Sequence, residues 1–449
     1  MEEITIEELL AKAEKPSKEA MRLHAYYKGK IGVTLKCRIR NFDDFAIWYT
    51  PGVAAVCREI HQDREKVYDY TNKWNFVAVI SDGSRVLGLG DIGPEAGLPV
   101  MEGKSLLYKY LGGVDAFPLC LNEKDPDRFI DIVKALQPTF GGVNLEDIAH
   151  PKCFKILDTL RQECEIPIWH DDQQGTACVT VAGLINALKI VGKKINEVAV
   201  VMIGSGAAGV AIVRLLMAAG VTPGNILSVD SKGILHRDRS DRDILQSKFK
   251  EKWDICLKTN EKQVKGDIPD AVRGADVLLS ASKQGPGTIR KDWIRSMGKD
   301  AIVFAMANPV PEIWPWEAKE AGARIVATGR SDFPNQVNNS LGFPGIFRGA
   351  LDIRAKTVTD EMCIAAAQEL AKVAEDHGLS EDYIVPNMDE WEVFPREAVA
   401  VGSKGIQQGV ARKSAPAEER FKTAEAIIKQ ARDQVQTLMK EKFIIDPDA

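Results

Sequence analysis

The chain has 449 residues, of which 45% are hydrophobic and 27% are charged, which is enough for two or three globular domains. The net charge of −5 argues against non-specific nucleic-acid binding, and no apolar run approaches the length needed to cross a bilayer. Eight scattered cysteines without a C-x-x-C pair, together with an acidic start, predict a reduced, cytoplasmic protein without a signal peptide. The six histidines form no cluster, which argues against zinc.

Alternating apolar runs and helix-length segments predict an α/β protein with two mainly parallel sheets. Residues 1 to about 70 are expected to be largely helical. The first set of strands is expected at residues 75–80, 114–121, 139–145 and 166–170, with helices near 102–111, 126–136 and 151–164. After an apolar helix near 176–191, the second set is expected near 198–203, 225–230, 276–280, 301–305 and 324–327.

The last hundred residues are predicted to be mainly helical. Apolar residues from Phe421 to Leu438 follow spacings of three and four, which is typical of an amphipathic helix. This helix is expected to pack on its own domain or on a second subunit, because its polar face mixes both charge signs and so does not suit a membrane surface. We therefore expect a homodimer.

Two acidic doublets follow neighbouring predicted strands of the first set. Glu146-Asp147 comes after residues 138–145, and Asp171-Asp172 comes after residues 166–170. In open α/β sheets, ligands bind beyond the carboxyl ends of the strands. Carboxylates gathered there repel one another unless a cation neutralises them, and an all-oxygen site suits Mg²⁺ or Mn²⁺. Solvated acids in two surface loops are the alternative.

A dinucleotide-binding pattern opens the second set of strands. The predicted strand at 198–203 runs into a strict G-x-G-x-x-G turn, followed by a helix and by a strand that ends in Asp230. The first glycine permits a tight turn, the second lets the backbone approach a pyrophosphate, and the third allows close helix–strand packing. The turn consists of Gly204, Ser205, Gly206, Ala207, Ala208 and Gly209.

The acid at the end of the second strand favours NAD. Asp230 is expected to accept hydrogen bonds from the adenine ribose and to repel the 2′-phosphate of NADP. A basic segment after it keeps NADP open, because its side chains could reach that phosphate; its members are Lys232, His236, Arg237 and Arg239.

A divalent metal beside NAD suggests oxidation of a 2-hydroxy acid followed by loss of CO₂, since the metal can chelate the substrate and stabilise the enolate. Several long sequence words then resemble malic enzyme. They are residues 49–54 (YTPGVA), 81–91 (SDGSRVLGLGD), 103–104 (GK), 171–177 (DDQQGTA), 338–340 (NNS) and 343–345 (FPG). The chain is similar to the short bacterial and archaeal form, without the longer eukaryotic N-terminal region or a phosphotransacetylase-like extension.

The resemblance implies catalytic roles for three residues. Tyr49 would be the general acid that protonates the enolpyruvate carbon. Lys104 would be the general base that takes the hydroxyl proton of L-malate, and Asp171 would orient it. Burial and a metal lower the pKa of such a lysine, whereas Asp171 raises it.

The resemblance also implies ligand-binding roles. Glu146, Asp147 and Asp172 would bind the metal, and Arg85 would bind a malate carboxylate. Three asparagines would contact malate or the nicotinamide side of the cofactor, namely Asn308, Asn338 and Asn339. The chain would then consist of a substrate and metal domain (1–175), a Rossmann NAD-binding domain (176–385) and a C-terminal helical segment (386–449).

Three other functions share parts of these patterns. A malolactic enzyme would keep NAD bound and release lactate. A non-catalytic malate or nucleotide sensor would tolerate loss of Lys104. An amino-acid dehydrogenase would need ammonia and no metal, and the acidic doublets argue against it.

Overall fold

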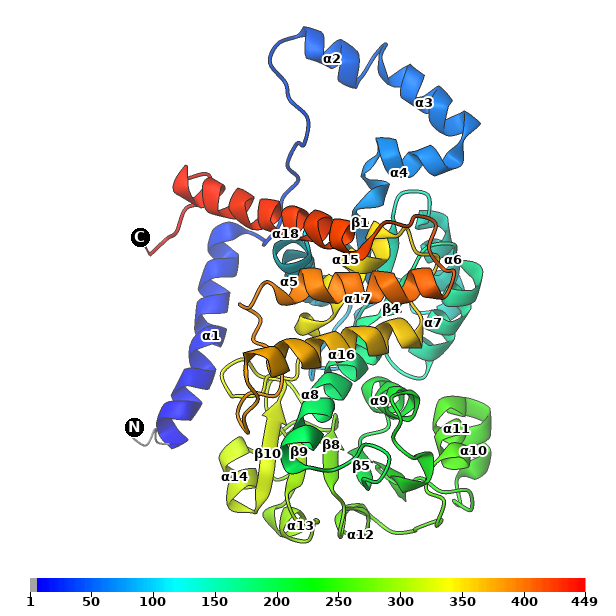
Figure 1. Ribbon diagram of the computed structural model, residues 1–449, viewed down its shortest axis with the longest axis vertical. Coiled ribbons are helices and arrows are strands. Elements are labelled where there is room, and N and C mark those ends of the chain that lie inside the picture. Colours follow the sequence, from blue (N-terminus) through cyan, green and yellow to red (C-terminus); the bar gives the residue numbers. More distant parts are fainter. Residues whose placement is uncertain (1–5, 449) are drawn as a thin grey trace.

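The computed structural model describes residues 6–448, which form two parallel sheets one above the other, flanked by helices (Figure 1). The first sheet has the strand order β2-β1-β3-β4 and is parallel throughout. Its strands coincide closely with the predicted apolar runs: β1 (Phe76–Ser81), β2 (Asp115–Cys120), β3 (Gly142–Leu145) and β4 (Ile168–His170). The α/β class with parallel sheets is therefore confirmed.

Three helices connect these strands. α6 (Pro126–Leu136) and α7 (Lys152–Glu163) pack against each other, whereas α5 (Pro94–Gly112) packs on β1 and β2. The Asp125 side chain caps α6 by accepting hydrogen bonds from the backbone amides of Asp127 and Arg128. α5 begins at Pro94 rather than near residue 102, and it continues through Pro99.

The apolar helix α8 (Thr176–Val191) leads from the first sheet to the second and packs against α9 and α16. Residues Asp171–Val191 are long and apolar enough to span a membrane by length and composition, with a mean hydropathy of 1.3. The expectation that no run approaches this length was therefore wrong. However, 72% of the 18-residue window that meets this criterion is buried inside the protein, as in the core helix of a globular fold.

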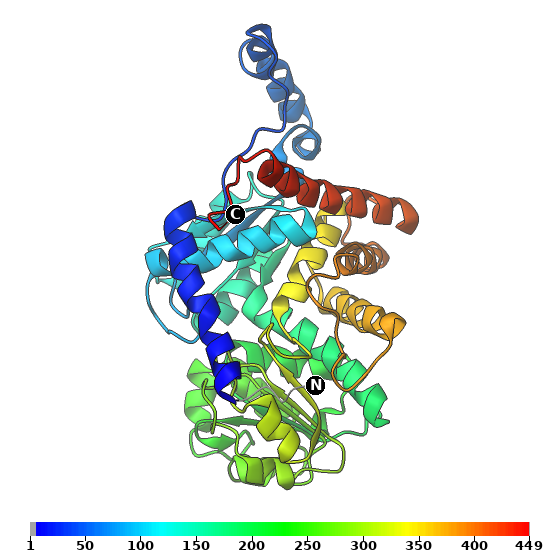
Figure 2. The same ribbon diagram turned by 90° about the vertical axis from the view of Figure 1, so that its left-hand side faces the viewer.

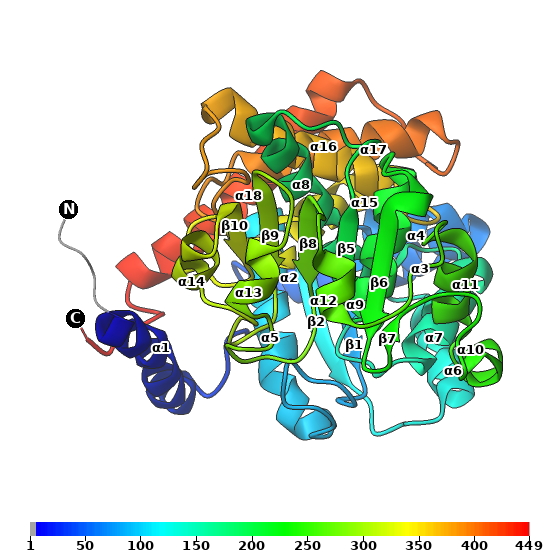
Figure 3. The ribbon, with the colours of Figure 1, turned by 90° about the horizontal axis from the view of Figure 1, so that it is seen from below.

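The second sheet has the order β10-β9-β8-β5-β6-β7 and is parallel except for β7 (Figure 3). The chain passes from β5 to β6 on one side and later returns to β8 on the other, which is the order of a Rossmann domain and creates a switch point beyond β5. The strands are β5 (Val200–Ile203), β6 (Ile226–Asp230), β7 (Gly233–Ile234), β8 (Val277–Ser280), β9 (Ala301–Ala305) and β10 (Ala323–Thr328).

Helices complete both layers. α9 (Ala207–Ala218) follows β5, and five short helices surround the second sheet: α10 (Arg242–Lys248), α11 (Lys250–Lys258), α12 (Ile268–Val272), α13 (Lys291–Arg295) and α14 (Pro315–Glu320). The later helices return to the first sheet, where α15 and α18 contact α5. They are α15 (Phe343–Asp352), α16 (Asp360–His377), α17 (Val393–Gln407) and α18 (Ala417–Lys440).

The N-terminal region contrasts with this packed body. After α1 (Ile6–Tyr27), residues 28–70 form a segment, here called the arm, that projects beyond the first sheet (Figures 1 and 2). The arm contains α2 (Asp43–Trp48), α3 (Val53–Gln62) and α4 (Val67–Tyr70), and no residue of α3 is buried. Large apolar side chains on it are exposed, including Val33 at 86% and Phe42 at 85%.

Candidate active site

The two acidic doublets meet at the carboxyl ends of neighbouring strands. β3 pairs with β4 so that Leu145 lies opposite His170, which places Glu146 beside Asp171. Glu146, Asp147 and Asp172 each offer one carboxylate oxygen, and these oxygens lie within 4.8 Å of one another. The backbone amide of Asp147 also donates to Asp172 Oδ2 at 2.8 Å. The backbone itself therefore holds the two doublets together.

The doublets carry more negative charge than their surroundings compensate. Burial raises the pKa of Glu146 well above its ordinary value, and repulsion by Asp172 and Asp171 adds to the effect. Burial, followed by repulsion from Asp172, raises the pKa of Asp147 to about 8. Asp147 Oδ2 is buried and has no hydrogen-bond partner among the described residues. Three close carboxylates with a free buried oxygen fit a hard divalent cation such as Mg²⁺ or Mn²⁺.

Lys104 lies next to this cluster, on the buried side of α5. Its ammonium donates to Asp171 Oδ2 and to Asn339 Oδ1, the latter at 3.2 Å, and lies 3.2 Å from Glu146 Oε1. It also lies 4.6 Å from the ring centre of Phe343. Burial lowers the pKa of Lys104, but the charges of Asp171 and Glu146 outweigh burial and hold this pKa above its ordinary value. Lys104 is therefore protonated while both acids are ionised.

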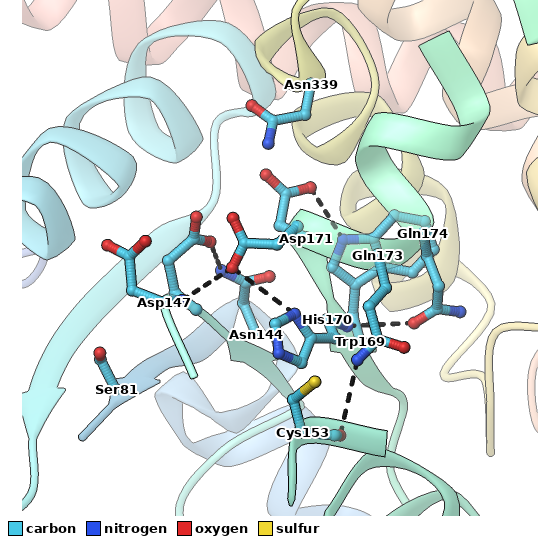
Figure 4. Close-up of polar contacts among 12 residues, drawn as sticks. Ser81, Asn144, Asp147, Cys153, Trp169, His170, Asp171, Gln173, Gln174 and Asn339 are labelled. Carbon is cyan, nitrogen blue, oxygen red and sulfur yellow. Dashed lines mark hydrogen bonds and ion pairs between the residues drawn. The ribbon is translucent and has the colours of Figure 1, made fainter. Parts of the chain in front are cut away.

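Several residues that support this pair were not singled out from the sequence. Trp169 donates from Nε1 to Asp171 Oδ1 at 3.0 Å (Figure 4), and Asn144 donates to Glu146 Oε2 at 2.9 Å. Each lies on a strand and precedes by two residues the acid that follows the strand end, and extended residues two apart share a face. This two-residue spacing is the sequence signal from which both supporting residues could have been predicted. Both bonds fix carboxylates that face Lys104.

The loop after β1 reaches the same cluster. The backbone amide of Arg85 donates to the Asp147 carbonyl at 3.0 Å, and that of Leu87 donates to Asp147 Oδ1 at 3.2 Å. The Arg85 side chain is exposed. Its charge lowers the pKa of Asp147, although less than burial and Asp172 raise it. Arg85 therefore lies beside the carboxylates with its guanidinium facing solvent.

The three predicted asparagines differ in their surroundings. Asn339 contacts Lys104, as described above. Asn338 is engaged locally, since its side chain donates to the Gly329 carbonyl at 3.0 Å and accepts from the Ser340 amide at 3.0 Å. Asn308 follows β9 and packs so closely on Gly329 that an added Cβ there would lie 2.5 Å from Asn308 Nδ2. Asn308 and Asn338 thus share Gly329, and only Asn339 reaches Lys104.

The glycine-rich turn after β5 has the shape that a pyrophosphate needs. Gly204 has a φ of +96°, and a Cβ on Gly209 would lie 1.8 Å from the Gly204 carbonyl oxygen. By contrast, a Cβ on Gly206 would meet only His150, at 3.7 Å, so the backbone there is open to a ligand. Ser205 is buried, and Ala207 and Ala208 begin α9. The turn therefore fits a dinucleotide, with the α9 N-terminus beneath it.

Asp230, at the end of β6, is not a free carboxylate. It accepts from Arg239 Nη1 at 2.9 Å and from Lys252 Nζ at 3.2 Å. Two members of the basic segment are thus engaged within the protein. Arg239 pairs with Asp230, and Arg237 donates to the Leu257 carbonyl at 2.8 Å. The sequence argument for NAD rests on the negative charge of Asp230, and in the fold two cations lie against that charge.

Tyr49 is the one predicted catalytic residue that this chain does not bring to Lys104. It lies directly after α2 on the arm, and 71% of it is exposed. Six other predicted residues lie together at the carboxyl ends of β3 and β4, namely Lys104, Asp171, Glu146, Asp147, Asp172 and Asn339.

Two family models match most of the chain. The model described as "Malic enzyme, N-terminal domain" matches residues 28–161, and the model described as "Malic enzyme, NAD binding domain" matches residues 173–404. The first match includes the arm and the carboxylates after β3. The second begins within the turn after β4 and includes the glycine-rich turn.

Individual relatives agree with these matches. A bifunctional malic/malolactic enzyme of Bacillus subtilis is 50% identical over 403 residues, covering 89% of this chain and 96% of the relative. An NADP-dependent malic enzyme of Halomonas elongata is 41% identical over 414 residues, covering 89% and 95%. The crystal structure of Entamoeba histolytica malic enzyme superposes with a TM-score of 0.96 at 49% identity, covering 99% of this chain and 93% of that one.

Proposed function

Because the chain belongs to the malic enzyme family, we propose that it oxidises L-malate with NAD or NADP and releases pyruvate and CO₂ in a reaction that requires Mg²⁺ or Mn²⁺. One observation carries this proposal: the oxygens of Glu146, Asp147 and Asp172 gather within 4.8 Å beside the Lys104–Asp171 pair. A cation site and a base are thus adjacent, at the edge where the first sheet faces the dinucleotide turn.

In this proposal each group of the chain has a defined task. Glu146, Asp147 and Asp172 would hold a divalent cation, which would supply Lewis-acid chemistry to the bound substrate. Lys104 removes the proton of the malate hydroxyl while hydride leaves for the nicotinamide ring. Asp171, held by Trp169, keeps the Lys104 amine in place. Because Glu146 contacts Lys104, the pKa of the base depends on how far the charge of Glu146 is compensated elsewhere.

The proposal is tested by absorbance at 340 nm with L-malate, Mn²⁺ and either NAD or NADP, followed by assays for pyruvate and lactate. We expect a rise that is matched by pyruvate and abolished by EDTA. Turnover that persists in EDTA would contradict the metal role. Lactate without net reduction of the cofactor would favour the malolactic reaction, which the name of the Bacillus subtilis relative makes the second candidate.

The enzyme is further proposed to act as a homodimer in which the arm supplies Tyr49 to the partner's Lys104. Tyr49 is exposed on a segment that projects from its own chain, together with apolar residues such as Val33 and Phe42. So many exposed apolar side chains on one segment indicate a surface that another chain covers. In the partner's site, the Tyr49 hydroxyl would protonate the enolpyruvate carbon after CO₂ has left.

Mixed dimers distinguish this arrangement from a site built within one chain. A Tyr49→Phe subunit paired with a Lys104→Ala subunit regains one complete site only if Tyr49 acts across the interface. Co-expression should then give about a quarter of the wild-type activity, because about half of the dimers are mixed and each has one working site. The two single variants, purified separately, serve as controls. Mixed dimers as inactive as the single variants would contradict the exchange.

A further inference from the structure

We propose that Lys252 adapts the adenine-ribose end of the dinucleotide site to a 2′-phosphate, so that the enzyme uses NADP. This inference rests on the proposed function only in assuming that the glycine-rich turn binds a dinucleotide. In such domains the acid at the end of the second strand contacts the ribose hydroxyls, and a nearby cation can accommodate a 2′-phosphate. Asp230 occupies the position of that acid, and Lys252 contacts it from α11.

The hydrogen-bonding capacity of Asp230 is largely used within the protein. Oδ1 accepts from the backbone amide of Lys232 at 2.9 Å and from Arg239 Nη1 at 2.9 Å. Oδ2 accepts from Lys252 Nζ at 3.2 Å. A carboxylate oxygen has two lone pairs, so only Oδ2 retains room for another donor. Asp230 therefore offers a ribose diol one acceptor site unless Lys252 moves away.

The charges around Asp230 also favour a phosphate. Arg239 bridges Asp230 and Asp241, contacting Asp241 Oδ1 at 2.8 Å and Oδ2 at 3.0 Å. Lys232 contacts Asp241 as well, at 3.2 Å. Two carboxylates thus face three cations, because Lys252 completes the set. A local excess of positive charge attracts a 2′-phosphate instead of repelling it.

Of the three cations, only Lys252 is both sheltered and free to turn. The Arg239 side chain is 4% exposed and is fixed by both acids, whereas Lys232 is 58% exposed and its charge is screened by solvent. Lys252 is 16% exposed, makes one long ion pair and has a flexible stem. It can therefore exchange Asp230 for a phosphate at small cost, while Arg239 keeps Asp230 paired.

A series of side-chain contacts connects Lys252 with the glycine-rich turn. Its ammonium lies 5.3 Å from the ring centre of Phe249, and that ring lies 6.1 Å from the ring of His150. His150 in turn is the nearest side chain to the open face of Gly206. This series of contacts leads from the glycine-rich turn to the side chain that pairs with Asp230, so Lys252 lies on the same side of the second sheet's strand ends as the glycines.

Two fragments without nicotinamide test the proposal by direct binding. The protein is titrated calorimetrically with 2′,5′-ADP and with 5′-AMP, which differ by the 2′-phosphate. A charge-assisted hydrogen bond changes affinity by about tenfold or more, so we expect 2′,5′-ADP to bind wild type at least about tenfold more tightly. Lys252→Met should remove most of this difference, and Lys252→Arg should keep it.

Lys258→Met is the matched control, because Lys258 lies on the same helix but pairs with Asp254 at 2.8 Å. It removes the same charge and should leave the preference unchanged. Tighter binding of 5′-AMP by wild type, an equal loss for both fragments in Lys252→Met, or no binding of either fragment would overturn the proposal. Absence of malate turnover with the fragment preference intact would count against the proposed function alone.

Discussion

The carboxylates at the strand ends of the two sheets are compensated in opposite ways. After β3 and β4, Glu146, Asp147 and Asp172 lie together, and Lys104 forms an ion pair with Glu146 of the three, so the pKa values of Glu146 and Asp147 stay raised. At the end of β6, Asp230 is compensated by two cations. The comparison teaches that an acid at a strand end does not by itself define a ligand. Where too few cationic side chains surround the strand-end acids, we predict a bound metal ion; where cationic side chains outnumber the acids, we predict a bound anion.

The largest expected effect is a loss of turnover on removing one carboxylate from the cluster of Glu146, Asp147 and Asp172. Asp172→Asn should lower malate turnover by at least about a thousandfold, because Lewis-acid stabilisation contributes several kcal/mol to such reactions. Mn²⁺ binding, followed by electron paramagnetic resonance, should weaken in parallel, while 5′-AMP still binds. Asp158→Asn, an exposed acid on α7, is the control. Loss of 5′-AMP binding in Asp172→Asn would show that the two sheets do not divide these tasks.

The next effect is a loss of stability on removing the arginine that pairs with Asp230. Arg239→Met leaves Asp230 and Asp241 without their shared, buried partner, which should lower the free energy of unfolding by roughly 3 kcal/mol. Urea denaturation measures this loss. Arg242→Met, which removes an exposed ion pair with Asp243, should change the stability little. Equal stabilities of the two variants would mean that Arg239 does not hold this region together.

The smallest effect concerns protons at the metal cluster. Because the pKa of Asp147 is raised to about 8, this side chain is protonated in the metal-free fold at neutral pH and loses its proton when a cation binds. Mn²⁺ affinity should therefore rise between pH 6 and 8, by at most about tenfold per pH unit for one proton. Calorimetry in buffers of different ionisation enthalpy counts the protons released. Asp147→Asn should release fewer, and an unchanged count would exclude Asp147 as their source.

The raised pKa of Asp147 also determines whether the metal-free fold gains or loses stability as pH rises. A carboxyl group whose pKa is higher in the fold than in the unfolded chain favours folding below its ordinary pKa and loses this contribution as pH rises toward the folded value. The EDTA-treated protein should therefore melt at a lower temperature at pH 8 than at pH 6. Asp147→Asn should flatten this difference.

Local patterns predicted most of the fold. Most strands of both sheets are short, buried and apolar, and all except β7 were found from the sequence within a few residues. The start of α5 was missed because Pro99 lies within it and suggests a break, although the helix tolerates it. β7 was missed because two residues, Gly233–Ile234, leave no periodic signal.

In the candidate site, too, local sequence patterns predicted some residues and missed those that only tertiary contacts bring together. The doublets were predicted because each follows its own strand, so sequence position alone places them at one edge. The contact of Lys252 with Asp230 could not be predicted, because β7 and α10 separate the two residues in the chain and only the tertiary fold brings them together. The location of Tyr49 on an exposed arm could not be predicted either. Apolar residues at helical spacing do not reveal whether their own chain or a second chain covers them.

The arm has a consequence for how catalysis responds to dilution. If Tyr49 reaches Lys104 only from a second chain, then the complete site exists only in the associated state, and its abundance follows mass action. Specific activity should then fall as the protein is diluted below the dissociation constant of the dimer. An enzyme assembled in this way is switched off by scarcity of its own subunits, without any inhibitor.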